Sequence, residues 1–310
     1  MKRILIVLAA SLVLAAGTPA CGGNEGPPPA PPKKEAQPSW HDIWDTTPDI
    51  YVVLRPQAIK RDAVYGSFWK SLLRVAEAKH ILSGQSMLEA AEGADEIVVG
   101  INPGVDAAMV IRGVPASLDA GKINDGHGRP LFRLANDKAK VPEYQLVDRQ
   151  SAIDGSMFVL PDRVWVGAVG DARTRARTAF ATPFGRPAPK TDNDSIALAR
   201  FGQQFLQQPQ YVKSQVWGPF TKKLYDVTIS LRPGKEGVLV ALHYEDEGST
   251  AYAEMQAKKL VAELAKDEKR WGWLKDATVA YEGNTVNVRL PVPARLVEEL
   301  PNASGRDMPM

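Results

Sequence analysis

The chain has 310 residues, with 38 basic and 36 acidic side chains, a net charge of +2 and a single cysteine. Lys2 and Arg3 lie at the start of the chain, and without them basic and acidic residues are equal in number. This balance excludes a typical nucleic-acid-binding protein, which clusters Lys and Arg to displace counterions from phosphates. A single cysteine excludes an intramolecular disulfide, and a domain of this length can bury a full core without one.

The N-terminal segment is typical of a secretory signal. An almost uninterrupted apolar run from residue 4 to 16 follows Lys2 and Arg3. As a helix this run would cover about 20 Å, which is shorter than the roughly 30 Å hydrocarbon core of a bilayer. A positive start, a short apolar run and small residues before a cleavage point predict an export signal rather than a membrane-spanning helix.

The signal ends in Thr18-Pro19-Ala20-Cys21, which resembles the lipobox of bacterial lipoproteins. The resemblance implies a diacylglycerol thioether on Cys21, cleavage before it and acylation of the freed amine by a chain such as palmitate. It also implies a cell-envelope location, anchored by lipid in the membrane. Because Gly22 rather than Asp follows the cysteine, the resemblance favours the outer membrane, facing the periplasm. Ordinary secretion with an incidental cysteine is the alternative.

A Pro- and Gly-rich stretch, residues 22–38, follows and has no apolar periodicity, so we expect an extended tether. A second polar, Pro-rich stretch marks a seam in the globular part. The resulting division is a signal peptide at 1–20, an acylated cysteine with its tether at 21–48, a first α+β subdomain at 49–182, a linker at 183–194, a second α+β subdomain at 195–301 and a disordered tail at 302–310.

Two segments of the globular part are similar to each other. Residues 96–112 and 226–242 both alternate apolar and polar side chains, and Pro103-Gly104 falls in register with Pro233-Gly234. Each segment therefore predicts two strands joined by a Pro-Gly turn. Two weaker matches come in the same order, residues 157–180 with 279–300 and residues 65–73 with 217–225. The first of these pairs predicts two strands followed by a helix, at 171–180 in one copy and 293–300 in the other. Their common order favours a tandem duplication over a chance pattern.

The duplicated unit predicts strands and helices in a fixed succession. A strand at 50–54 and its counterpart at 195–200 open the copies, and the first copy adds a helix within 80–95. In the second copy Ser249 or Thr250 is expected to cap a helix over 251–267. We therefore predict an α+β fold of antiparallel sheets built from hairpins, with helices packed on one face and a groove between the copies.

One short pattern is a candidate nucleophile motif. Ser67 and Lys70 fit the Ser-x-x-Lys pattern that penicillin-binding proteins and serine β-lactamases use. Those enzymes also need a Lys-Thr-Gly segment, and the corresponding Lys-Thr here, at 190–191, is followed by Asp192. Exposed positions on an amphipathic helix explain Ser67 and Lys70 better.

Two further patterns concern histidines. His243 and Glu245 alternate on an expected strand, as in the first part of a metal site, although a polar outer face of a sheet is the preferred interpretation. Asp125, His127 and Arg129 share a Gly-rich loop that could carry function or be an ordinary turn-rich connection.

These observations lead to three functional hypotheses. The leading one is a lipid-anchored cell-envelope protein that acts as a non-catalytic binding or structural module. It needs no cofactor and no nucleic acid, and it meets the membrane through the lipid on Cys21. One alternative is a periplasmic hydrolase of envelope polymers, centred on Ser67 or His127. The other is a carrier of an apolar ligand in the groove between the two subdomains.

Overall fold

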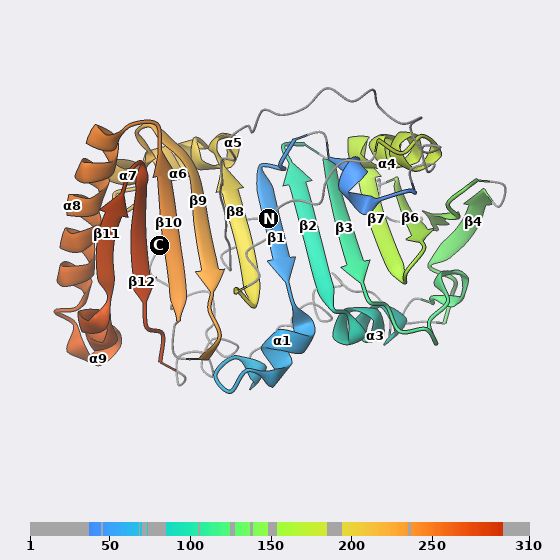
Figure 1. Ribbon diagram of the computed structural model, residues 1–310, viewed down its shortest axis with the longest axis horizontal. Coiled ribbons are helices and arrows are strands. Elements are labelled where there is room, and N and C mark those ends of the chain that lie inside the picture. The colour runs from blue at the N-terminus through green and yellow to red at the C-terminus, as the bar shows by residue number, and fades with distance from the viewer. Residues whose placement is uncertain are drawn as a thin grey trace, which may run out of the picture.

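The computed structural model describes residues 37–293, with gaps at 45, 68, 70–72, 74–84, 105, 125–127, 137–138, 148–153, 185–193 and 235–236. The described residues form an antiparallel sheet of 12 strands flanked by helices (Figure 1). The strands are β1 (Ile50–Leu54), β2 (Glu96–Asn102), β3 (Asp106–Arg112), β4 (Phe132–Asn136), β5 (Glu143–Leu146), β6 (Gly155–Leu160), β7 (Val164–Gly170), β8 (Ala197–Gly202), β9 (Leu224–Leu231), β10 (Val238–Tyr244), β11 (Thr278–Glu282) and β12 (Thr285–Leu290). The helices are η1 (Trp40–Ile43), α1 (Pro56–Arg61), α3 (Gln85–Gly93), η2 (Ala120–Lys122), α4 (Asp171–Ala181), α5 (Gln203–Leu206), α6 (Pro209–Val212), α7 (Gly218–Thr221), α8 (Glu247–Leu264), α9 (Glu268–Trp271) and η4 (Gly272–Asp276).

The strand order is the same in the two halves of the sheet. Counted outward from the centre, the first half runs β1-β2-β3-β7-β6 and the second runs β8-β9-β10-β12-β11. In each half the strand that comes last in the chain lies between the two strands before it in the unit. β7 thus lies between β3 and β6, and β12 lies between β10 and β11. β5 and β4 extend the first half beyond β6. The α+β fold made of antiparallel hairpins is therefore as predicted, and its strand order is that of a tandem duplication.

The two halves meet by backbone pairing. β1 pairs antiparallel with β8, from Ile50 opposite Phe201 to Leu54 opposite Ala197. Arg55 reinforces the seam, because its guanidinium donates to the backbone carbonyl of Ser195. Where the repeat led us to expect a groove between the copies, the described strands form one continuous sheet.

The core lies on both faces of the sheet. Ile97 and Val98 are neighbours in β2 and therefore point to opposite faces. α4 and η1 pack on the face of Val98, whereas α1 and α3 pack on the face of Ile97. Strand register places Val288 on the face of Ile97 as well, and α8 covers that face in the second half. The prediction had helices on one face; the structure adds α4 and η1 on the other, because both faces carry apolar side chains.

Local signals account for the turns, and one of the two predicted helix starts is correct. The hairpins β2–β3 and β9–β10 turn at the two Pro-Gly pairs, where Gly104 has φ 90° and Gly234 has φ 62°. α4 begins at the predicted Asp171. α8 begins earlier than predicted, because Asp246 rather than Ser249 or Thr250 is its N-cap.

The folded part also begins earlier than residue 49, the predicted boundary. Trp40, Ile43 and Trp44 are buried, and the rings of Trp40 and Trp44 meet edge to face at 6.1 Å. η1 packs against α4, so this stretch belongs to the core rather than to the tether. Among the described residues no helix is long and apolar enough to span a bilayer. The signal peptide, Cys21, the tail and all but the first residue of the closing helix expected at 293–300 lie outside the described residues.

Candidate functional site

α8 is held in place at its N-terminus and along one face. The Asp246 carboxylate accepts a hydrogen bond from the Ser249 N–H at 2.8 Å. It also forms an ion pair with Lys223, whose Nζ lies 2.8 Å away. Together these contacts lower the pKa of Asp246 to about 2, with Lys223 the larger cause. The buried face of the helix consists of Thr250, Ala253 and Ala257, whose small side chains let the helix approach the sheet closely.

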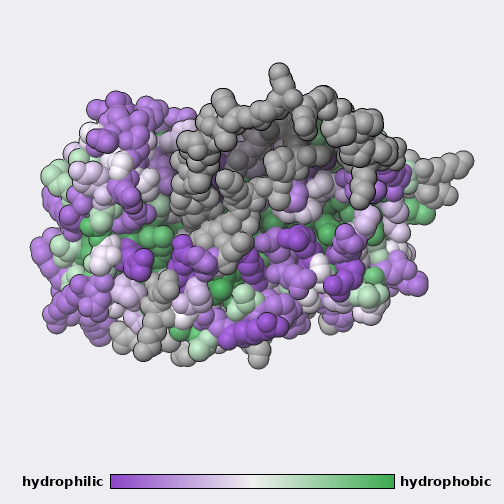
Figure 2. Space-filling model, viewed as in Figure 1, coloured by the Kyte–Doolittle hydropathy of each residue, from purple (hydrophilic) through white to green (hydrophobic). Residues whose placement is uncertain are grey.

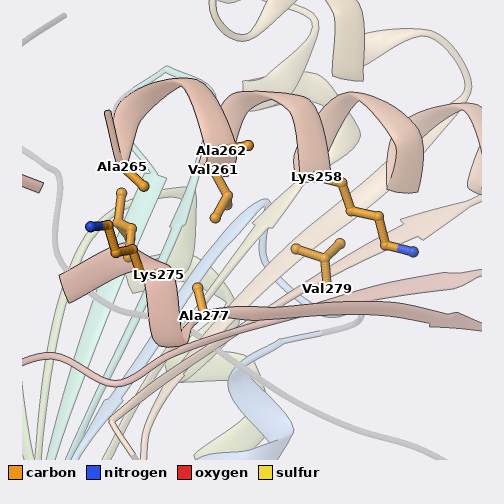
Figure 3. Close-up of a pocket in the computed structure, with 8 residues that line it drawn as sticks. Lys258, Val261, Ala262, Ala265, Lys275, Ala277 and Val279 are labelled. Atoms are coloured by element: carbon orange, nitrogen blue, oxygen red, sulfur yellow. The ribbon is translucent and has the colours of Figure 1, made fainter. Parts of the chain in front are cut away.

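Beyond Ala257 the helix and the edge of the sheet enclose a pocket of about 390 Å³. Its two walls come from α8 on one side and from η4 and β11 on the other (Figure 3). The lining residues are Lys258, Val261, Ala262, Ala265, Leu274, Lys275, Ala277 and Val279. Three of the eight are alanines, and their short side chains leave the space between helix and strand unfilled.

Between two lysines the side chains that line the pocket are apolar. Lys258 Nζ lies 2.8 Å from Glu254 and Lys275 Nζ lies 2.5 Å from Glu268, and in Figure 3 both ammonium groups point away from the gap. The hydrogen bond from Lys275 lowers the pKa of Glu268. The lining includes no carboxylate, imidazole, hydroxyl or thiol that could act on a bound molecule. The geometry of this pocket therefore suits binding of an apolar group.

A second pocket, of about 450 Å³, lies where the chain enters the fold. Its lining mixes charges of both signs from Asp95, Arg112, Asp162 and Arg163. The guanidinium of Arg112 already donates to Glu96 at 2.7 Å. We regard the pocket beneath α8 as the stronger candidate, because six of its eight lining side chains are apolar, whereas the lining of the second pocket includes charges of both signs.

A row of polar residues crosses the second half of the sheet. Asp226, His243 and Thr285 are direct neighbours on β9, β10 and β12. Nδ1 of His243 lies 3.0 Å from the Thr285 hydroxyl, and Arg200 Nε donates to Asp226 at 2.9 Å. Burial lowers the pKa of His243, Asp226 opposes this effect and Arg200 adds to it. His243 is therefore neutral near neutral pH.

The metal interpretation of His243 and Glu245 does not fit this arrangement. The register of β9 and β10 shifts between His243 and Tyr244, so the alternation that would align His243 with Glu245 is broken. Glu245 follows the end of β10, and its N–H donates to the carbonyl of Lys223. Within the described part of the chain, no three His, Cys, Asp or Glu side chains gather as a metal site would require.

The other predicted site residues are not brought together with the pocket. Cys21, Asp125, His127 and Lys70 lie outside the described residues. Arg129 is exposed beside the isolated bridge between Asn124 and Pro130. Ser67 is exposed at the start of a helical segment. Sequence reasoning missed the pocket, because its only local signal is the run of small residues on one flank of α8 and before β11.

Comparisons with known proteins bear on the fold. No family model matches the sequence, and neither does any curated protein. Crystal form I of TP0453 superposes with a TM-score of 0.52 and 10% identity, covering 87% of this chain and 98% of that one. Crystal form IV of TP0453 gives 0.51 and 10%, covering 84% and 96%. At this level of identity the likeness shows a shared α+β fold.

Proposed function

We propose that this chain is a lipid-anchored, non-catalytic binding protein of the cell envelope, held at the outer membrane by the lipid on Cys21. Its binding site is the pocket beneath α8, which takes an apolar group from a partner or ligand. The observation that carries the proposal is the pocket itself, in which six of the eight lining side chains are apolar and the other two, both lysines, are already paired with glutamates. When an apolar group fills a cavity lined by apolar side chains, water leaves both surfaces and the free energy falls.

Photo-crosslinking in intact cells tests this proposal. The photoreactive residue p-benzoylphenylalanine replaces Ala262, which lines the pocket, or its neighbour Glu263, whose side chain is 67% exposed and pairs with Lys266. Ultraviolet light should produce an adduct of higher mass from the Ala262 position and not from the Glu263 position.

Two results would contradict the proposal. Equal adducts from both positions, or none from either, would show that the pocket binds nothing in the cell. Turnover of peptidoglycan or simple esters by the purified chain, abolished by Ser67→Ala or His127→Ala, would replace the binding role with a hydrolytic one.

A further inference from the structure

We propose that the apolar group filling the pocket is Tyr281 of a second copy of this chain, brought there by antiparallel pairing of β11 with β11 of that copy. The inference rests on the proposed binding role of the pocket and names its partner. The interaction surface, here called the α8–β11 surface, consists of Met255, Lys258, Ala262, Val279 and Tyr281.

β11 is an edge strand without a Lys, a Pro or a bulge. Among the described strands it pairs only with β12, and Figure 1 places it at one end of the sheet beside α8. Its residues, Thr278–Glu282, include no Lys and no Pro, and its pairing with β12 has no bulge. The opposite edge, β4, carries Arg133 and a register shift between Leu134 and Asn136. Lys, Pro and bulges shield many natural edge strands, and β11 has none of the three. Its charged residue is Glu282, and α8 packs over one of its faces.

The hydrogen-bonding phase of β11 suits a further strand. Glu282 and Thr285 close a two-residue turn at Gly283-Asn284, in which Gly283 has φ 52°. The pair that closes such a turn is hydrogen-bonded, and bonded pairs alternate along the ladder. The backbone N–H and C=O groups of Val279 and Tyr281 therefore point away from β12, toward the open edge.

A two-fold axis through Ala280 satisfies these groups. It pairs Val279 with Tyr281 of the second copy, twice by symmetry, and makes four backbone hydrogen bonds. Thr278 then lies opposite Glu282 of the second copy, and Ala280 lies opposite Ala280 of the second copy. No like charges therefore oppose one another. Aromatic residues opposite β-branched residues are favourable cross-strand pairs.

The same register delivers a side chain to the pocket. Tyr281 and Val279 are two residues apart on β11 and share the face that α8 covers. Tyr281 of the second copy, opposite Val279, would lie against the wall formed by Lys258 and Ala262. In the single chain Tyr281 is 48% exposed and Met255, on the same flank of α8 as Ala262, is 55% exposed. Apolar residues interrupt the hydrophilic surface at this end of the molecule in Figure 2.

The chain already joins its own halves in this manner. β1 and β8 pair edge to edge and antiparallel through the centre of the sheet, with Val52 opposite Ala199 in the middle. The proposed pairing of β11 repeats that arrangement at the outer end of the second half.

Disulfide trapping in the full-length chain, extracted in neutral detergent, tests the pairing. On the two-fold axis the Ala280 Cα atoms of the two copies would be about 4.5 Å apart, within the roughly 4.4–6.8 Å that a disulfide spans. Ala280→Cys should therefore form a dimer on oxidation. The matched control is Ala135→Cys, which places a thiol at an exposed position of the other edge strand, β4. The unsubstituted chain controls for Cys21.

Sedimentation equilibrium on the chain without the added thiol gives an independent reading. We expect a dimer mass, which Tyr281→Lys should reduce to that of a monomer without lowering the melting temperature. A monomer mass for the unsubstituted chain, or equal disulfide yields from Ala280→Cys and Ala135→Cys, would overturn self-pairing. If photo-crosslinking at Ala262 instead captured a different molecule, self-pairing would fail while the proposed binding role would stand.

Discussion

Asp226 and His243 face each other across β9 and β10, with Oδ1 of the carboxylate 3.6 Å from Nε2 of the imidazole. The other carboxylate oxygen of Asp226 accepts from Arg200. Among the described residues Oδ1 has no hydrogen-bond donor. Neutral His243 is thus held close to a carboxylate oxygen with which it forms no ion pair.

The burial of His243 predicts a pH dependence of stability, which the nearby Asp226 carboxylate only partly offsets. Burial holds the pKa of folded His243 below its ordinary value of 6.5, so the unfolded chain binds a proton more readily. The stability that neutral His243 contributes is therefore fully present above its ordinary pKa of 6.5. It is lost as the pH drops from about 7 to about 5. His243→Gln should reduce the fall in melting temperature over this range. Because burial and Arg112 also lower the pKa of His41, the double variant with His41→Gln should be flatter still. Melting curves with the same slope in all chains would contradict the prediction.

The N-cap of α8 predicts a loss of stability in Asp246→Ala. The substitution removes the acceptor for the Ser249 N–H and the partner of Lys223. We expect the melting temperature to fall by roughly a few degrees. Asp267→Ala is the control, since Asp267 caps the four-residue helix α9 and the loss should be smaller. Equal losses from the two variants would show that the cap of α8 has no special weight.

The pocket predicts opposite effects for two neighbouring alanines of α8. Ala257 is buried against the sheet, so Ala257→Leu should overpack the core and destabilise the fold by about 1–3 kcal/mol. Ala262 lines the pocket and is exposed, so Ala262→Leu should fill the space without loss of stability. Urea denaturation measures both free energies of unfolding. Destabilisation of the same size in both chains would mean that the pocket has no room for a larger side chain.

The proposed lipid anchor predicts a change in location for Cys21→Ser. Without the thiol no thioether to diacylglycerol can form, so the protein should enter the soluble fraction or remain as uncleaved precursor. Fractionation of cells followed by immunoblotting measures this. If the variant is processed as before and stays with the membranes, the anchor proposal is wrong.

Local chemistry was enough to predict much of the fold. The Pro-Gly pairs at 103–104 and 233–234 specify turns, because Pro presets φ and Gly accepts positive φ, and the flanking alternation specifies strands. The existence of α8 followed from apolar periodicity and capping residues, and that of α4 from the match between the two copies. The start of α8 was misplaced by a few residues, because Asp246, Ser249 and Thr250 all have side chains that can cap and only the structure selects Asp246.

Tertiary structure decided how these elements combine. The seam between β1 and β8 joins the halves into one sheet because each edge presents unpaired backbone groups that the other satisfies, and no local pattern of residues encodes that choice. The pocket likewise depends on Ala262 and Ala277, which are distant in sequence and meet only where α8 passes over the edge strand. By itself the sequence determined the turns, because they depend on neighbouring residues, and it indicated the repeat through similar segments. The lipid anchor at Cys21 stays a prediction from the sequence. The position of the pocket and the polar row of Asp226 and His243 depend on register between strands, which only the folded chain establishes.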